Sequence, residues 1–254
     1  MLARPFRFRR TKISAQAWRM SGEPPLRDQC AASAGVLLSA VMPVSEAADC
    51  AARVLDAQAK WTSDFGGEQF ALGRAFYTHL ETGRVKEYFA HARASDALVE
   101  SVLPGIQEKT FGLLARMLGG SVRKREGFCG PGVHVFPAGG KVAREGGVVH
   151  FDLEGLSEYQ KAARSPAVSL VWMLQPGVWG GGLRLFDVLF DGCPDSEIEP
   201  GDYGFLTVRS EAGDALLFDS LRLHQIRPFR GTRGRISITV HAAWVDQGAW
   251  EAWF

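Results

Sequence analysis

Short stretches of alternating apolar and polar residues fill the second half of the chain. They predict strands over residues 132–136, 147–152, 167–174, 182–186, 214–218 and 235–242, which glycine-containing turns separate. Antiparallel strands in a sandwich or barrel fit this spacing better than alternating strand and helix units do. The alternation is strictest over residues 235–242, where one face is apolar and the other carries Arg235, Ser237, Thr239 and His241.

Residues 42–120, which precede these strands, have helical periodicity instead. Ser45 is a candidate N-cap of a first helix, and Ser95 is a candidate N-cap of a later one. Pro104 fits the first turn of a last helix that stops at Gly119. Because the helices come in one block before the strands, we expect them to support one face of the sheet. The pattern therefore predicts a mainly β fold with packed helices.

Residues 1–41 differ in composition from the rest of the chain. Several basic residues precede the first acid, Glu23, and prolines at positions 5, 24 and 25 interrupt any amphipathic helix. We interpret the segment as a disordered or non-native extension, the latter with Met42 as the true beginning, rather than as an organelle-targeting segment. Residues 42–254 are then expected to form a single domain, with a helical part over about 42–120 and a strand-rich core over about 121–254.

The composition restricts the partners and the compartment. The 254 residues are 46% hydrophobic, which is enough for one sizeable core. The formal net charge of +1 gives no general attraction to nucleic acid or to an anionic membrane, so a small, roughly neutral molecule is the simpler partner. The four cysteines are scattered without a CxxC pair, which favours a reducing, cytoplasmic setting. No apolar run approaches the roughly 20 residues of a membrane helix.

Two histidines and a carboxylate carry the candidate chemistry. His150 and Asp152 alternate on the predicted strand 147–152, so their side chains point to the same face, and His224 comes later in the chain. These are the ligands of the 2-His-1-carboxylate triad, which binds non-haem Fe(II) and leaves coordination positions open. Two polar residues alternating on a strand are by themselves often only its exposed face, so the triad needs support from elsewhere in the chain.

That support comes from the polar face of the predicted strand 235–242. Arg235 and Ser237 lie two residues apart on it, and an arginine and a hydroxyl so placed could clamp a carboxylate beside a metal. Arg233 competes with Arg235 for this role. We favour Arg235, because it stands on the polar face directly before Ser237.

Four linked sequence pieces resemble the Fe(II)/2-oxoglutarate-dependent dioxygenases, in particular their prolyl-hydroxylase-like branch. They are HFD at residues 150–152, GGGLRLFD at 180–187, GDALLFDSLRLHQIRPF at 213–229 and GRISI at 234–238. Each piece is weak alone, but their order and spacing are specific. The resemblance covers about residues 132–244 and implies a double-stranded β-helix core, also called a jelly-roll or cupin-like core, with an N-terminal helical support.

The resemblance also implies roles for individual residues. His150, Asp152 and His224 would hold Fe(II), while Arg235 and Ser237 would bind the distal carboxylate of 2-oxoglutarate. The branch often has a tyrosine on the strand before HxD, where this chain has Phe136, with His134 two residues earlier on the same face. Four further residues are candidates for substrate or supporting contacts and equally for core positions: His134, Phe136, Trp172 and His241.

The implied activity is oxidative. O2 would be the cosubstrate, succinate and CO2 would be released, and the default outcome is hydroxylation of a small molecule such as an amino acid or a natural product. The segment 188–212 is acidic and glycine- and proline-containing, which is typical of a long loop or lid. The alternatives are a protein side-chain hydroxylase of the same family, a non-catalytic cupin-like metal-binding or sensory module, and a zinc hydrolase with the same ligands. The last two do not need an arginine clamp beside the metal.

Overall fold

The computed structural model describes residues 11–246 and 249–254. A large sheet runs through the middle of the molecule, and most of its neighbouring strands are antiparallel. In spatial order its strands are β1 (Thr11–Ser14), β2 (Val36–Ser39), β11 (Ala215–Asp219), β7 (Ala167–Gln175), β14 (Arg235–Asp246), β6 (Gly132–Phe136), β4 (Gln69–Leu72) and β3 (Thr62–Asp64). At the far end of β14, β15 (Ala249–Trp253) pairs with it, and β5 (Ser121–Lys124) pairs with β15.

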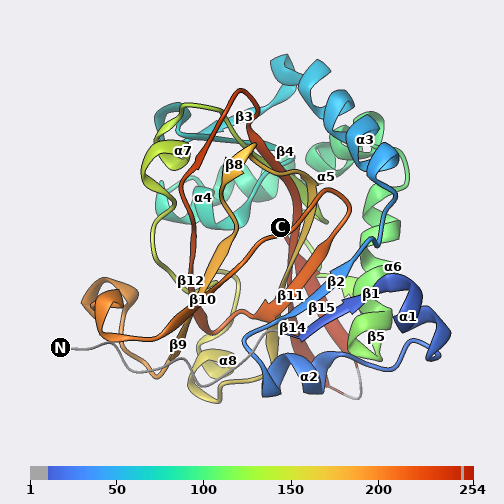
Figure 1. Ribbon diagram of the computed structural model, residues 1–254. Coiled ribbons are helices and arrows are strands. Elements are labelled where there is room, and N and C mark those ends of the chain that lie inside the picture. Colours follow the sequence, from blue (N-terminus) through green and yellow to red (C-terminus); the bar gives the residue numbers. More distant parts are fainter. Residues whose placement is uncertain (1–10, 247–248) are drawn as a thin grey trace.

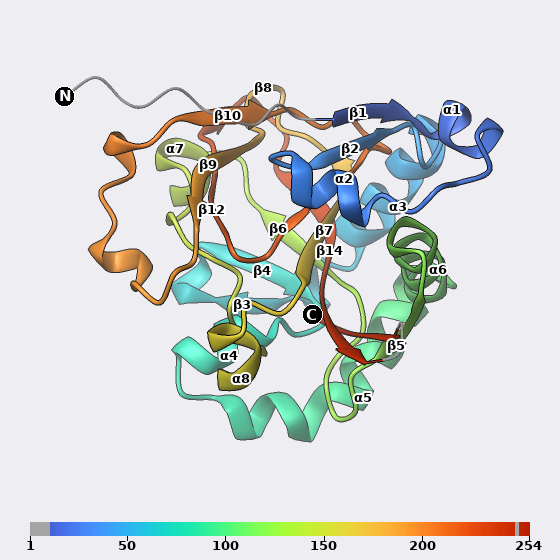
Figure 2. The ribbon, with the colours of Figure 1, turned by 90° about the horizontal axis from the view of Figure 1, so that it is seen from below.

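A small antiparallel sheet faces the large one. Its strands are β10 (Phe205–Val208), β9 (Leu183–Leu189) and β12 (Arg222–Ile226), and a two-stranded ribbon of β8 (Trp179–Gly180) and β13 (Phe229–Arg230) lies beside them. Figures 1 and 2 show β9, β10 and β12 on one side of the large sheet, with α3 and α6 on the other side. Two facing sheets of this kind form a double-stranded β-helix, which is the predicted fold.

The helices cover mainly the side of the large sheet that faces away from the small one. They are α1 (Ala15–Met20), α2 (Arg27–Ala32), α3 (Val44–Asp56), α4 (Phe76–Glu81), α5 (Val85–Val102), α6 (Ile106–Leu118), α7 (Lys141–Glu145) and α8 (Glu158–Ala162), with single 3-10 turns η1 (Gln58–Lys60), η2 (Phe65–Gly67), η3 (Asp195–Glu197) and η4 (Pro200–Asp202). No helix among the described residues is long and apolar enough to cross a membrane.

Strict alternation on β14 divides the molecule into a core and a cavity. Its apolar residues, such as Ile236 and Ile238, enter the largest hydrophobic cluster, together with Val54 of α3 and Leu113 of α6. Its polar residues point to the opposite face, toward the small sheet. The helices therefore stabilise one face of the sheet by apolar burial, and polar side chains on the other face line the cavity.

The predicted strands are confirmed with one exception. Residues 132–136, 167–174, 182–186, 214–218 and 235–242 correspond to β6, β7, β9, β11 and β14. Residues 147–152 form no strand, because they meet the small sheet only at an isolated bridge between His150 and His224. The pattern did not predict β10, which lies inside the expected loop 188–212 and extends the small sheet by pairing with β9.

The helix boundaries differ from the expected ones at their N-termini. The cap residue of α3 is Pro43, which has no side-chain capping bond, so Ser45 lies inside the helix. Ser95 lies in the interior of α5, which already begins at Val85. The helix expected after Pro104 is α6, which begins two residues after this proline and ends at Leu118. Its C-cap is Gly119, whose left-handed backbone (φ 66°) closes it as predicted.

The expectation of a disordered or non-native extension before Met42 is wrong for residues 11–41. Strand β2 pairs with β11 of the large sheet and β1 pairs with β2, while Trp18 and Leu38 are buried in the main hydrophobic cluster. The short apolar run at residues 36–38 carries this pairing, and the surrounding basic residues and prolines hid its signal. Residues 1–10, which carry much of the basic charge, lie outside the described residues.

Candidate metal centre

His150 and His224 are brought together by backbone pairing. The amide of each donates a hydrogen bond to the carbonyl of the other, with N to O distances of 3.0 and 2.9 Å. This single bridge joins the segment after Gly147 to β12, and it places the centres of the two imidazole rings 4.2 Å apart. A complete strand is therefore not needed to place His150, because one correctly registered pair is sufficient.

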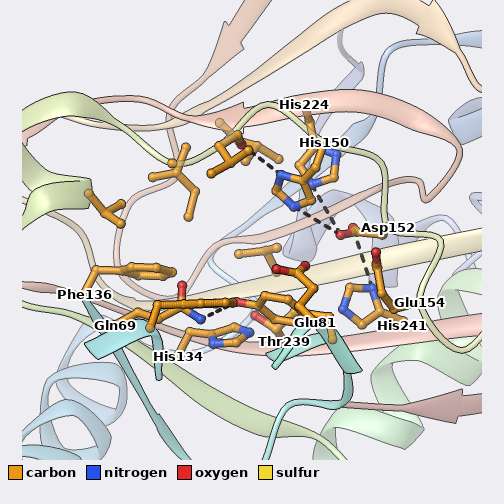
Figure 3. Close-up of a pocket in the computed structure, with 18 of the residues that line it drawn as sticks. Gln69, Glu81, His134, Phe136, His150, Asp152, Glu154, His224, Thr239 and His241 are labelled. Atoms are coloured by element: carbon orange, nitrogen blue, oxygen red, sulfur yellow. Dashed lines mark hydrogen bonds and ion pairs between the residues drawn. The ribbon is translucent and has the colours of Figure 1, made fainter. Parts of the chain in front are cut away.

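Asp152 completes a three-residue cluster. Its amide donates to the carbonyl of Ser220, and its Oδ1 lies 3.5 Å from Nε2 of His150 and 3.5 Å from Nε2 of His224. The three candidate ligand atoms lie within 4.8 Å of one another. Figure 3 shows the two imidazoles and the carboxylate converging on one point at the cavity wall. The structure thus brings together the three residues that the sequence pattern singled out.

The outer nitrogens of both histidines are held by backbone carbonyls. Nδ1 of His150 lies 2.9 Å from the carbonyl of Val148, and Nδ1 of His224 lies 2.9 Å from the carbonyl of Arg222. In a neutral imidazole this arrangement places the proton on Nδ1 and leaves the lone pair of Nε2 free. Both lone pairs then face the Oδ1 atom of Asp152, as a metal bound between the three residues requires.

The second carboxylate oxygen of Asp152 is fixed by a hydroxyl network. Ser169, on the cavity face of β7, donates from Oγ to Oδ2 of Asp152 at 2.5 Å. The same Oγ lies 2.8 Å from Oγ of Ser220 and 3.0 Å from Nδ1 of His241. Oδ2 is therefore occupied within the protein, and Oδ1 is left to face the histidines. His241, a predicted candidate, supports the carboxylate, whereas the sequence pattern gave no signal for Ser169 or Ser220.

The Ser169→Ala variant is expected to bind Fe(II) between about 10-fold and 100-fold more weakly, because loss of a hydrogen bond that orients a metal ligand has effects of this size. Anaerobic equilibrium titration with Fe(II) measures this change. Ser101, an exposed serine of α5, is the matched control, and Ser101→Ala should leave the affinity unchanged. Equal affinities in the two variants would show that Asp152 does not depend on this hydroxyl.

The cluster shares a proton when no metal is bound. Burial acts to raise the pKa of Asp152, but the imidazoles of His224 and His241 hold it well below its usual range. Removal from bulk water acts to lower the pKa of His150, but the hydrogen bond to Asp152 and the charge of that carboxylate outweigh this and raise the pKa to about 9. The metal-free site is therefore an imidazolium and a carboxylate at neutral pH.

Fe(II) binding is expected to strengthen as the pH rises from about 7 to about 9, by up to about tenfold per pH unit, because the metal must displace the proton of His150. Above about pH 9 this proton is already lost, so the dependence should become flat. Proton release measured by calorimetry in buffers of different ionisation enthalpy checks the effect. An affinity that stays constant across this range would contradict the proton-sharing arrangement.

Arg235 is a buried cation that has no acidic partner among the described residues. It is 4% exposed, its Nη1 donates to Oγ of Ser237 at 3.2 Å, and its guanidinium lies 5.5 Å from the ring centre of Phe136. Within the described part of the chain, no carboxylate lies within ion-pair distance of it, and its Nε has no hydrogen-bond partner. Burial lowers the pKa of the guanidinium to about 10. Such a group is costly to bury unless an anion joins it. Arg233, by contrast, is exposed in the bend before β14.

A cavity of 680 Å³ connects the candidate metal position with Arg235. The neighbouring residues His134, Phe136 and Thr239 line its wall, as Figure 3 shows. His134 is 7% exposed, and its Nδ1 has no hydrogen-bond partner among the described residues. Burial lowers the pKa of His134 to about 3, so this imidazole is neutral. His134 and Phe136 are thus cavity residues, as two of the open candidates predicted.

Trp172 does not line this cavity. Ser169 and Val171 of β7 point to the cavity, whereas the alternate residues Val168, Leu170, Trp172 and Leu174 lie in the main hydrophobic cluster. Trp172 accordingly packs in the main hydrophobic cluster and donates from Nε1 to the carbonyl of Gly213 at 3.3 Å. Its position on β7 alternates with those of Ser169 and Val171, so its side chain points to the opposite face of the sheet.

Three acidic side chains that the sequence analysis did not single out also line the cavity. Glu81 ends α4, Glu154 follows Asp152 by two residues, and Asp195 begins η3. Burial raises the pKa of Glu154 to about 7 and raises the pKa of Glu81. Within the segment 188–212, Asp195 is the described residue that lines the cavity. Nothing in the sequence links these three positions, because they come from separate parts of the chain.

Comparison with known proteins gives a likeness to solved structures. No protein-family model and no curated protein matches the chain. It is similar to the non-heme alpha-ketoglutarate-dependent epimerase SnoN from nogalamycin biosynthesis, with 15% identity over 89% of this chain and 84% of that chain and a TM-score of 0.51. The chain shares this fold. At such low identity the likeness is one of fold, and it confirms the predicted double-stranded β-helix.

Two further structures are also similar to this chain. One is SnoN in complex with Fe3+, alpha-ketoglutarate and nogalamycin RO, with 16% identity over 89% of this chain and 87% of that chain and a TM-score of 0.49. The other is a prolyl hydroxylase from Trichoplax adhaerens in complex with a hypoxia inducible factor peptide fragment, with 12% identity over 87% of this chain and 90% of that chain and a TM-score of 0.46.

Proposed function

We propose that the chain is an Fe(II)/2-oxoglutarate-dependent oxygenase that oxidises a small organic molecule. The observation that carries this proposal is the unpaired, buried guanidinium of Arg235 in the same cavity as the cluster of His150, Asp152 and His224. Neither metal binding alone nor zinc-dependent hydrolysis requires a buried cation beside the metal. A cosubstrate that is an anion at one end and a metal chelator at the other uses both features.

The donor set fits Fe(II). Two neutral imidazoles and one carboxylate carry a single negative charge, and they leave coordination positions open for a chelating ligand. The carbonyl bonds to both Nδ1 atoms and the Ser169 bond to Asp152 fix the three donors before a metal arrives. Fe(II) would therefore be held by His150, Asp152 and His224.

The remaining cavity residues fit 2-oxoglutarate. Arg235 would bind its distal carboxylate, and Ser237, already bonded to Nη1 of Arg235, would donate its hydroxyl to the same group. Phe136 packs against the guanidinium and limits its movement. A bound carboxylate would also give Arg235 the negatively charged partner that it lacks among the described residues.

Bound iron and 2-oxoglutarate supply oxidising chemistry that protein side chains lack, with consumption of O2 and release of succinate and CO2. The chain itself contributes binding, orientation and exclusion of water. Phe136, Phe218 and Val171 give the cavity apolar walls between its polar groups. Such walls restrict the substrate to a fixed orientation and keep water from the reacting atoms.

We propose hydroxylation of a small molecule as the default reaction. The similar structure SnoN is named an epimerase, so epimerisation at a carbon centre is the second candidate outcome for this fold. A cavity of 680 Å³ supports a small-molecule substrate, because pockets of this size bury most of a ligand of a few hundred daltons.

Conversion of 2-oxoglutarate to succinate is the assay for this proposal. The purified protein, supplied with Fe(II), O2 and 2-oxoglutarate, is expected to form succinate, and a metabolite library should contain compounds that accelerate it. Omission of Fe(II) and the His224→Ala variant are the controls, and neither should form succinate above background. Succinate formation that is the same without iron, or that is absent with every library compound, would count against an oxygenase.

A further inference from the structure

The outer face of the small sheet, which points away from the cavity, carries Arg184 of β9. Its neighbours on that strand, Leu183 and Leu185, pack inward in the cluster between the two sheets, so Arg184 points outward. Its guanidinium lies 4.0 Å from the ring centre of Phe205 of β10. Nε of Arg184 is buried and has no hydrogen-bond partner among the described residues. The group is therefore held against an aromatic ring without the acceptor that a guanidinium normally finds.

Two more arginines adjoin Arg184 on this outer face. Arg209 and Arg227 lie on either side of Gly182, which directly precedes β9. The amide of Arg227 donates to the carbonyl of Gly182 at 3.0 Å, and a Cβ added to Gly182 would lie 3.3 Å from Cγ of Arg209. Both arginines follow, by two positions, residues that lie opposite Arg184 in the ladder, so their side chains share its face. We call Arg184, Arg209 and Arg227 the arginine face.

No acidic side chain among the described residues neutralises the arginine face. None of its three guanidinium groups has a carboxylate within 4.0 Å in that part of the chain. Other arginines differ, because Arg123 and Arg125 both lie within 3.4 Å of the carboxylate of Glu251. The net charge of +1 therefore conceals a local excess of positive charge on one side of the molecule.

Exposed aromatic rings extend the arginine face. Phe205 is 47% exposed, and Trp179 of β8 is 72% exposed. Trp179 pairs in register with Arg230 of β13, which adds a fourth exposed arginine. The ribbon of β8 and β13 continues the ladder of β9 and β12, because the amide of Gly181 donates to the carbonyl of Pro228. Positive charge and exposed aromatic surface thus follow one another along the small sheet and its ribbon.

The sequence before β1 gives an independent observation. Residues 4–10 read RPFRFRR, so four arginines are interleaved with two phenylalanines and no acid occurs. The chain enters the large sheet at Thr11, whose amide donates to the carbonyl of Gly35 at 3.1 Å. A Cβ added to Gly35 would lie 3.4 Å from Cδ1 of Leu185 on β9. The basic segment therefore joins the described chain beside the small sheet, and basic N-terminal arms of this kind are typical of nucleic-acid binding.

We propose that the arginine face binds single-stranded nucleic acid. Guanidinium groups pair with phosphate oxygens in a bidentate manner, and exposed aromatic rings stack on unpaired bases. An acidic peptide would use the arginines, but it would leave the exposed rings of Phe205 and Trp179 without a stacking partner. Paired bases cannot stack on these rings, so the strand is single. Because the face points away from the cavity, this interaction is separate from the proposed oxidation.

Fluorescence anisotropy with a labelled oligothymidylate of about 12 nucleotides tests this proposal. The logarithm of the association constant should fall with the logarithm of the salt concentration with a slope of about −2, since each neutralised phosphate of a single strand contributes about −0.7. Arg184→Ala and Arg227→Ala should each weaken binding by about fivefold to tenfold and make the slope shallower by about 0.7. Phe205→Ala should weaken binding by about tenfold with an unchanged slope, because stacking releases no counterion.

Arg53→Ala is the matched control. Arg53 is exposed on α3, on the other side of the large sheet (Figure 1), and has no ion pair among the described residues, so its loss should change neither affinity nor slope. Thermal unfolding shows whether each variant is folded. A slope that stays the same in Arg184→Ala and Arg227→Ala would overturn the proposal, as would no binding at about 100 μM protein in low salt.

Two competitors test the class of partner. A polyglutamate peptide of the same length that binds more tightly than the oligonucleotide would assign the arginine face to an acidic protein instead. A duplex of the same sequence that binds as tightly as the single strand would contradict the role of the exposed rings. The titrations use the full chain without metal or 2-oxoglutarate, so failure of this proposal leaves the proposed function standing.

Discussion

Replacing Arg235 with alanine is expected to raise the 2-oxoglutarate concentration for half-maximal succinate formation by about two orders of magnitude. The reason is that the distal carboxylate of 2-oxoglutarate would lose the only buried cation among the described residues that line the cavity. Truncating one partner of a buried charge pair costs roughly 2–5 kcal/mol. Iron affinity measured without cosubstrate should be nearly unchanged, because Arg235 is not among the clustered ligand atoms. Steady-state titration of 2-oxoglutarate measures the effect.

Arg233→Ala is the matched control for this prediction. Arg233 lies two residues earlier in the chain, but it is exposed in the bend before β14, whereas Arg235 is 4% exposed on the cavity face of that strand. The control should shift the 2-oxoglutarate requirement little. A large defect in Arg233→Ala with a silent Arg235→Ala would show that the wrong arginine has been assigned to the carboxylate.

The His224→Ala variant is expected to lose both tight Fe(II) binding and succinate formation, and His150→Ala is expected to do the same. Each removes a histidine whose ring is fixed by a carbonyl bond to Nδ1, and among the described residues the clustered ligand atoms belong only to His150, Asp152 and His224. Fe(II) content after anaerobic loading and gel filtration measures the loss. The thermal unfolding temperature should fall less than activity does, because the core lies on the other face of the sheet.

His91→Ala is the control for the histidine variants. His91 lies exposed on α5 and its Nδ1 bonds only to the backbone carbonyl of Glu87, so its loss should leave iron content and activity at the wild-type level. Full iron content in either His150→Ala or His224→Ala would remove that residue from the ligand set. Equal losses of iron and activity in His150→Ala, His224→Ala and the control His91→Ala would indicate general loss of folded protein rather than loss of a metal ligand.

The alternation of residues along the strands was enough to predict a mainly β fold and the positions of most of its main strands, whereas the double-stranded β-helix was implied by the resemblance of four sequence pieces. Period-two patterns do not depend on distant contacts, so the faces of β14 could be assigned before the structure, and its polar face indeed lines the cavity. His150, Asp152 and His224 were singled out by residue type and order alone. The strand expected around His150 is absent, because one bridge to His224 supplies the pairing.

Other features depend on contacts that no local pattern carries. The short run at residues 36–38 becomes a strand because β11 offers it an edge, and basic residues nearby masked that signal. Trp172 was a candidate by residue type, but its parity on β7 turns it toward the helices. Ser169 reaches Asp152 only because β7 crosses the cavity beside it. The three acidic side chains that line the cavity likewise come from segments that only the fold brings together.

Titration of 2-oxoglutarate into the anaerobic protein, with and without one equivalent of Fe(II), tests most directly whether the site holds metal and cosubstrate together. We expect one Fe(II) per chain, and 2-oxoglutarate binding that is at least about tenfold tighter in the iron-loaded protein than in the metal-free protein. That difference should disappear in His224→Ala. Equal 2-oxoglutarate affinity with and without iron, or unchanged iron stoichiometry in His224→Ala, would contradict the proposed centre.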